Sequence, residues 1–171
     1  MVRAPEPDFG QLGGTEEKTR DLHRAEGVAF VLADINRSRT VGSGELMGGI
    51  CLICFDELVE CWETTAGLVH FMQNYCGLTE PRSSYLEYPG PRWSMHMMRF
   101  KRLSSDVKIL YAAARLISES KGRSVEHVVI TPLHVLLAAA QDRSTELGKS
   151  LRDSGLLIHK LKAATEPKIG T

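Results

Sequence analysis

Four cysteines, Cys51, Cys54, Cys61 and Cys76, are the residues best suited to metal or thiol chemistry. Cys51-x-x-Cys54 with Cys61 has a spacing at which thiolates can bind zinc. Zinc pairs of this kind usually lie on a tight knuckle and are joined by a second pair elsewhere. Here positions 51, 54, 58 and 61 fall on one face of an apolar helical run. The pattern favours buried thiols over a zinc site or a redox or nucleophilic cysteine, so we expect no metal and no cofactor.

Three histidines could serve as bases or ligands. His134 lies in the most apolar stretch, where a catalytic base would need a polar partner in reach. His70 lies beside Phe71 on an amphipathic segment, which favours a partly buried packing role, and His127 is expected to be solvated. The chain has no Ser-His-Asp order, HExxH, GxSxG or dinucleotide fingerprint, which removes the common catalytic classes without excluding an enzyme.

Gly148-Lys149-Ser150 resembles the end of a phosphate-binding loop. The first glycine of that motif would fall at Arg143, and no strand is predicted before it. We therefore interpret the segment as an exposed part of a helix and expect no ATPase activity from it.

Methionine and aromatic side chains gather between positions 85 and 98. Such side chains suit an adaptable apolar contact surface. The segment can simply pack a linker onto the rest of the fold, or it can form a site for a ligand or a partner together with Trp62. The candidate binding residues on this basis are Trp93, Met95, Met97, Met98, Tyr85, Tyr88 and Trp62.

Composition excludes several kinds of partner. Hydrophobic content is 43%, charged content is 25%, and the net charge is zero. A neutral chain lacks the clustered basic surplus with which proteins bind nucleic acid or anionic membranes. Its longest apolar run, near Ile50–Phe55, is too short to span a bilayer. The first residues carry Glu6 and Asp8 and no apolar core of a signal peptide, so we expect a cytoplasmic protein with reduced thiols.

Helical periodicity covers most of the first half of the chain. Residues 1–14 are rich in Pro and Gly and are expected to form a flexible arm. From Thr15 an apolar stripe predicts one helix up to Asn36–Thr40. Ser43 is the predicted N-cap of a second helix that runs through Leu58. A third helix is predicted over Thr64–Tyr75, with a stop at Gly77-Leu78.

The second half has the same order of signals. Ser104 or Ser105 is expected to cap a long alanine-containing helix that ends at Gly122. Thr131-Pro132 predicts the start of a helix. The residues that follow are apolar nearly all round, so we expect this helix to be central and buried. Helices over Ser144–Ser154 and Leu157–Ala164 follow, separated by a stop at Gly155 and Leu156.

These signals predict two related units. Repeat one spans residues 15–78, a linker rich in Pro and Gly spans 79–103, and repeat two spans 104–165. The first unit is longer between its cap and its stop, which indicates an inserted loop of about ten residues around Glu57–Thr65.

The segment AAARLISESKGRSVEHVVITPLHVLLAAAQDRSTELGKSLRDSGLLIHKLKAA resembles the N-terminal repeat of Clp unfoldases, and ITPLHVLLAAAQD is most similar to the ClpB version. RAEGVAFVLADINRSRTVGSGELMGGI in the first half resembles the same repeat. The resemblance implies an all-α Clp N-domain-like bundle of about eight helices in two pseudo-symmetric repeats, standing alone without the ATPase modules. It also implies that His134 packs against neighbouring helices.

In the ClpC branch an acidic residue just after the capping threonine helps to bind phospho-arginine. The matching positions are Gly44 and Pro132, and neither is acidic. Glu45 lies one position away and is the only candidate to take that role, so the resemblance implies a degraded or repurposed site.

Two functions follow. The first is a non-catalytic module that binds peptides or proteins, as an adaptor or accessory factor of Clp proteolysis; its partners would be the Clp machinery or its substrates. The alternative is a repurposed protein or motif-less biosynthetic enzyme that binds a small apolar ligand in a pocket lined by Met97, Trp93 or Trp62. Fold alone does not choose between them.

Overall fold

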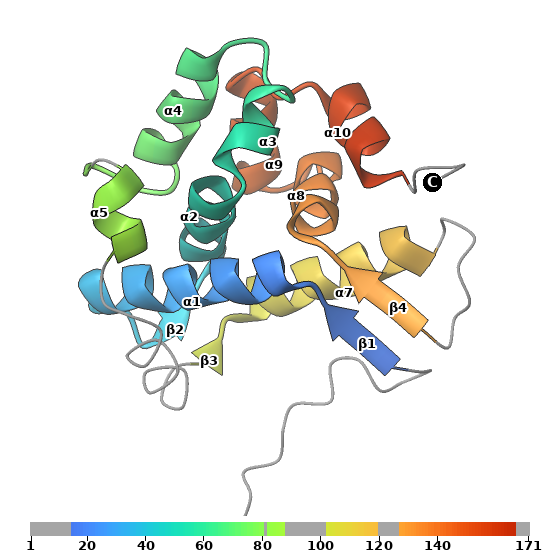
Figure 1. Ribbon diagram of the computed structural model, residues 1–171, viewed down its shortest axis with the longest axis horizontal. Coiled ribbons are helices and arrows are strands. Elements are labelled where there is room, and N and C mark those ends of the chain that lie inside the picture. The colour runs from blue at the N-terminus through green and yellow to red at the C-terminus, as the bar shows by residue number, and fades with distance from the viewer. Residues whose placement is uncertain (1–14, 81, 88–101, 120–126, 167–171) are drawn as a thin grey trace, which may run out of the picture.

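The computed structural model describes residues 15–80, 82–87, 102–119 and 127–166. Helices form most of this part of the chain, as predicted, and four short strands join them (Figure 1). None of the described helices is both long enough and apolar enough to cross a bilayer. The predicted arm at 1–14 and the segment with Tyr88, Trp93, Met95, Met97 and Met98 lie outside the described residues.

The first half of the chain alternates short strands and helices. Thr19 caps the first long helix, because its hydroxyl accepts a hydrogen bond from the Leu22 N–H. The prediction that this helix starts at Thr15 is wrong, since residues 15–18 form a strand. The elements are β1 Thr15–Lys18, α1 Arg20–Ile35, β2 Thr40–Val41, α2 Ser43–Ile53, α3 Phe55–Val59 and α4 Thr65–Asn74.

After a further short helix, the second half begins with the same order of strand, long helix, strand and helix. Thr131 caps the central helix and Pro132 occupies its first turn, as predicted. Every residue from Pro132 to Ala140 is buried, which confirms the expected central position of this helix. The elements are α5 Arg82–Glu87, β3 Arg102–Leu103, α7 Ser105–Glu119, β4 His127–Ile130, α8 Pro132–Gln141, α9 Glu146–Asp153 and α10 Ile158–Thr165.

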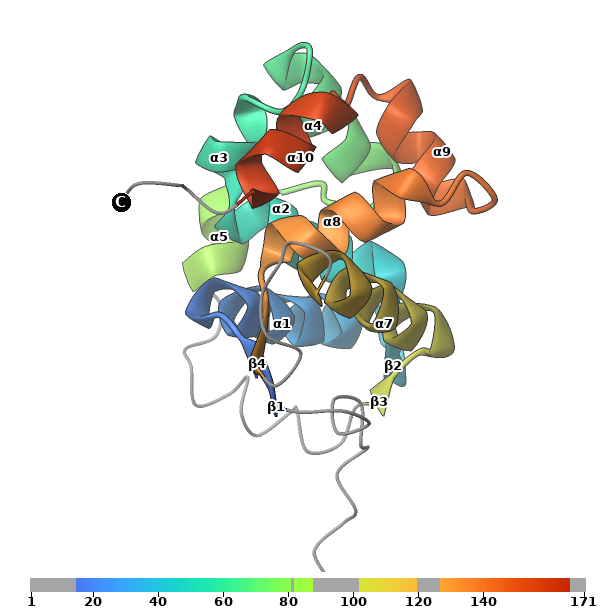
Figure 2. The ribbon, with the colours of Figure 1, turned by 90° about the vertical axis from the view of Figure 1, so that its right-hand side faces the viewer.

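The strands pair reciprocally between the two halves. β1 pairs in parallel with β4, and β3 pairs in parallel with β2. Thus the strand that leads into the first long helix of each half lies beside the strand that leads into the central helix of the other half (Figure 2). Two further backbone bonds have the same relation: Thr19 donates to Ile130 O at 3.1 Å, and Ser104 donates to Val41 O at 3.0 Å. The two halves are therefore interlocked rather than merely adjacent.

A buried polar contact joins the two long helices at corresponding positions. Glu26 lies seven residues after the cap of α1, and Tyr111 lies seven residues after Ser104. The Tyr111 hydroxyl donates to Glu26 Oε2 at 2.6 Å, and the Lys18 ammonium lies 3.0 Å from the same oxygen. Lys18 also lies 4.4 Å from the centre of the Tyr111 ring. The buried carboxylate is thus satisfied by both halves.

Helix ends match the sequence signals at two glycines. Gly77 and Gly155 have φ of 69° and 99°, the left-handed conformation that ends a helix. The N–H of the leucine that follows each glycine bonds back to a helical carbonyl: Leu78 to Met72, and Leu156 to Leu151. The predicted Gly-Leu stops are therefore confirmed.

The predicted second helix is interrupted at Cys54. The Cys54 N–H bonds to Ile50 O, and its carbonyl accepts from Leu58 N–H, so this residue ends α2 and begins α3. The guanidinium of Arg82, on α5, donates to the Leu52 carbonyl at 2.8 Å. Part of the expected linker is therefore helix α5, whose Arg82 satisfies a carbonyl near the end of α2.

Two further sequence predictions are wrong. Gly42 rather than Ser43 is the N-cap of α2, because Ser43 already belongs to the helix and its hydroxyl lies 3.0 Å from the Tyr75 hydroxyl. His70 is exposed rather than partly buried, because its ring points along the surface of α4 to the Asn74 amide, 2.9 Å away.

Candidate functional site

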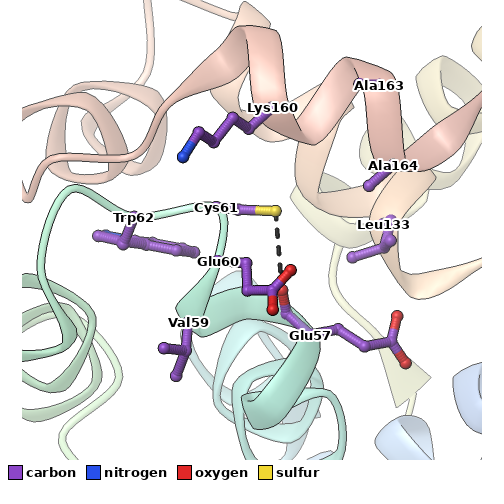
Figure 3. Close-up of a pocket in the computed structure, with 9 residues that line it drawn as sticks. All are labelled: Glu57, Val59, Glu60, Cys61, Trp62, Leu133, Lys160, Ala163 and Ala164. Atoms are coloured by element: carbon purple, nitrogen blue, oxygen red, sulfur yellow. Dashed lines mark hydrogen bonds between the residues drawn. The ribbon is translucent and has the colours of Figure 1, made fainter.

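A pocket of about 710 Å³ lies where the two halves meet, away from the paired strands. Its walls come from α3 and the loop after it, from the first turn of α8, and from α10 (Figure 3). The lining residues are Glu57, Val59, Glu60, Cys61, Trp62, Leu133, Lys160, Ala163 and Ala164.

A short antiparallel bridge holds the two walls together. Trp62 pairs with Leu156, so that Glu63 N–H donates to Gly155 O at 2.9 Å and Leu157 N–H donates to Cys61 O at 2.8 Å. Leu157 is the N-cap of α10. The bridge therefore fixes the start of α10 against the loop that follows α3.

Trp62 is held in one orientation. Its indole N–H donates to the Ser154 hydroxyl at 2.9 Å, and that hydroxyl donates in turn to the Leu151 carbonyl at 2.7 Å. The ring is 3% exposed and lies 6.1 Å from the Phe71 ring, centre to centre. The pocket thus has a rigid aromatic wall whose polar atom is already satisfied.

The pocket is apolar inside and charged at its rim. Cys61, Trp62 and Leu133 are buried, whereas the side chains of Ala163 and Ala164 are exposed and too small to fill the space. Glu57 and Glu60 lie on the α3 side, and Lys160 lies across the opening on the α10 side (Figure 3). Within the described part of the chain, none of these three charged groups has an ionic partner within 4 Å.

The pKa of the thiol in the pocket, that of Cys61, lies above its ordinary value. Burial raises the pKa of Cys61, the carboxylates of Glu60 and Glu57 raise it further, and Lys160 opposes them. Its Sγ lies 3.8 Å from the Glu57 carbonyl, the geometry of a weak S–H donor. A protonated thiol is neither the attacking nor the metal-binding form.

The other cysteines are also free, buried thiols. Burial, then Glu57, raises the pKa of Cys54 to about 12. Among the described residues no three side chains of His, Cys, Asp or Glu are grouped to hold a metal ion. The expected role of the cysteines as small buried hydrophobic side chains agrees with this environment.

Three of the predicted site residues lie in the described part of the chain, and they do not converge. Trp62 lines the pocket. Tyr85 is buried in α5, where its hydroxyl accepts the backbone N–H groups of Thr79 and Glu80, each at 3.1 Å. Glu45 lies in the first turn of α2 and does not line the pocket.

Sequence reasoning missed most of the pocket wall, including Glu57, Glu60 and Lys160. One signal pointed there: the segment around Glu57–Thr65, which is extra relative to the second half, supplies the acidic side of the pocket and Trp62. The α10 side gave no signal, because lysine and two alanines on a short amphipathic helix are ordinary surface residues.

Comparisons with known proteins gave no match, whether the chain was compared with models of protein families, with curated proteins or with solved structures. Any function assigned to it therefore rests on its own residues and geometry and on the resemblance of its sequence to the Clp repeat.

Proposed function

We propose that this chain is a non-catalytic binding module of the Clp N-domain type, which receives peptide or protein segments as an adaptor or accessory factor of Clp proteolysis. The supporting observation is the reciprocal pairing of β1 with β4 and of β3 with β2, an arrangement that two pseudo-symmetric repeats would produce. The repeat-like sequence of the second half points the same way.

The pocket between α3 and α10 is the proposed receiving site. It combines an apolar interior, a fixed aromatic wall and rim charges that have no ionic partner among the described residues, the composition of sites that bind ligands. Burial raises the pKa of its thiol, and none of the described residues that line it forms a base–nucleophile pair, so we propose a binding role rather than a catalytic one.

The first experiment measures binding directly. The purified chain is titrated with casein, as an unfolded protein, and with a purified Clp unfoldase lacking its own N-domain. We expect saturable binding to at least one of them. Absence of binding to both, by a correctly folded chain, would contradict the proposed function.

A matched pair of variants then locates the site. Ala163→Trp fills the pocket from an exposed helical position, whereas Ala112→Trp makes the same change on the exposed face of α7. We expect the first variant to lose most of the binding and the second to keep it. Equal binding by both variants would show that the binding site lies outside this pocket.

A second candidate function, binding of a small apolar molecule, is favoured by the presence of Trp62 at the cavity. The charged rim suits such a ligand less well than a peptide. Energy transfer from tryptophan to a hydrophobic dye, measured in wild type and in Ala163→Trp, separates the two candidates: only a small-ligand site would bind the dye saturably in wild type and lose it in the variant.

A further inference from the structure

The acidic side of the pocket has a charge arrangement that its own helix disfavours. Glu57 and Glu60 are three residues apart on the short helix α3, where like charges repel. Glu60 is the C-cap residue, and an acidic side chain at a helix C-terminus is opposed by the helix dipole. Both carboxylates are exposed and lack an ionic partner among the described residues. A positive group placed at this rim would relieve both unfavourable interactions.

The interior next to these carboxylates is apolar. Leu133 and Ala164 lie on the side of Glu57, Ala163 lies higher on α10 in this view, and Cys61 and Trp62 lie beside Glu60 (Figure 3). A matching occupant needs an apolar stem several carbons long and a cationic head. Among protein side chains, only lysine and arginine have that construction.

We infer that the pocket receives an arginine side chain from an extended peptide segment, with the guanidinium at Glu57 and Glu60. The inference rests on the proposed function, since it names the ligand class of the same site. The two carboxylates lie apart in the pocket, one near Leu133 and one near Cys61 (Figure 3). A guanidinium has five donors in a planar fork and can donate to several carboxylate oxygens in a fixed geometry, whereas an ammonium is a compact point charge with three donors.

Lys160 sets the direction in which the peptide lies. Its ammonium is on the α10 side of the opening, opposite the carboxylates. It repels a cationic head from that side and can donate a hydrogen bond to a backbone carbonyl of the peptide. The guanidinium is therefore directed to α3 and the peptide backbone to α10.

The test compares blocked pentapeptides that carry arginine, citrulline or lysine between two leucines. Citrulline keeps the shape of arginine and removes its charge. We expect the arginine peptide to bind about tenfold more tightly than the citrulline peptide at low ionic strength, with lysine between them. This preference should disappear in Glu57→Gln/Glu60→Gln and weaken with added salt, because exposed charges are screened.

The control is Glu146→Gln, which removes an exposed acidic side chain in the first turn of α9, outside the pocket. It should leave the preference for arginine unchanged. One result would overturn the placement of a guanidinium at Glu57 and Glu60: equal affinity for the arginine and citrulline peptides, with binding still abolished by Ala163→Trp. Peptide binding at the pocket would then still stand. Absence of binding of all three pentapeptides to a wild-type chain that still binds casein or the Clp unfoldase would overturn the arginine site and leave the proposed function standing.

Discussion

The two central helices begin at corresponding places in the two halves but are capped in different ways. At α8, the Thr131 hydroxyl accepts a hydrogen bond from the His134 backbone N–H. In return, the Thr131 backbone N–H donates to His134 Nδ1 at 3.0 Å. At α2, the N-cap is Gly42 and has no side-chain cap. Instead the carboxylate of Asp106, on α7, accepts from Ser43 N–H at 3.3 Å.

The difference shows how the halves depend on one another. The start of α8 is satisfied by residues within its own first turn, whereas the start of α2 is completed by a residue more than sixty positions away. The start of α2 therefore depends on the docking of the second half, through the contact with Asp106. Four substitutions test this contrast.

The largest expected effect is at Gly49, in α2. The Cβ of a side chain there would overlap the Ala25 carbonyl oxygen, so α1 and α2 can approach this closely only because this residue is glycine. We expect Gly49→Ala to lower the free energy of unfolding by about 3 kcal/mol, measured by urea denaturation. The position that corresponds to it in α8 is Ala138, where Ala→Gly should cost about 1 kcal/mol. Similar losses at the two positions would contradict the close approach.

Removal of the local cap comes next. Thr131→Ala should lower the free energy of unfolding by about 1–2 kcal/mol, because the hydroxyl that accepts from His134 N–H is lost, whereas the backbone N–H of residue 131 keeps its bond to His134 Nδ1. Thr131→Ser keeps the hydroxyl and should stay within about 0.5 kcal/mol of wild type. A full loss in the serine variant would mean that the threonine methyl, and not the cap, stabilises α8.

Removal of the distant cap should cost less and should depend on pH. Burial alone would raise the pKa of Asp106, but hydrogen bonds from Ser104, Ser43 and Val107 lower it overall. A carboxylate with a lowered pKa stabilises the fold above its unfolded pKa of 3.8, and this contribution is lost as the pH falls through the folded value.

Asp106→Ala should therefore lower the free energy of unfolding by about 1 kcal/mol at pH 7. The difference from wild type should shrink below the ordinary carboxyl pKa, whereas the effect of Thr131→Ala should not follow that titration. Urea denaturation at a series of pH values checks both. A pH-independent loss in Asp106→Ala would show that the carboxylate charge plays no part.

The smallest effect is a gain. Gly42 has φ of −90° and ψ of 178°, which any residue adopts, and a Cβ there would meet only the flexible Glu45 carboxylate at 3.5 Å. Gly42→Ser should supply the missing local cap and raise the free energy of unfolding by a few tenths of a kcal/mol. Combined with Asp106→Ala, it should recover part of that variant's loss. Destabilisation by the serine alone would contradict the open geometry at α2.

The same contrast explains what could be predicted from the sequence. Thr131-Pro132 and the two Gly-Leu stops act through neighbours within a few residues, so their patterns were sufficient. The cap from Asp106 and the contact from Arg82 to Leu52 join residues of different helices, so no local sequence pattern could predict them. Ser43 was misassigned for that reason, since a serine beside a glycine is the better local cap.

The paired strands and the pocket were hidden for a related reason. Strands of two to four residues are too short for an alternating pattern, and they exist because each finds a partner in the other half. The pocket combines α3 of the first half with α10 of the second, so only the Trp62 segment could be suspected from the sequence.

The most direct test of peptide binding between α3 and α10 is an amide and indole NMR titration of the full chain with the arginine pentapeptide. Four groups should shift together and saturate: the indole N–H of Trp62, the amides of Glu63 and Leu157, which donate the two bonds of the bridge beside the pocket, and the amide of Cys61, whose carbonyl accepts one of them. Shifts that spare these four groups and gather elsewhere, for example along α7, would contradict the account, as would a spectrum that the peptide leaves unchanged.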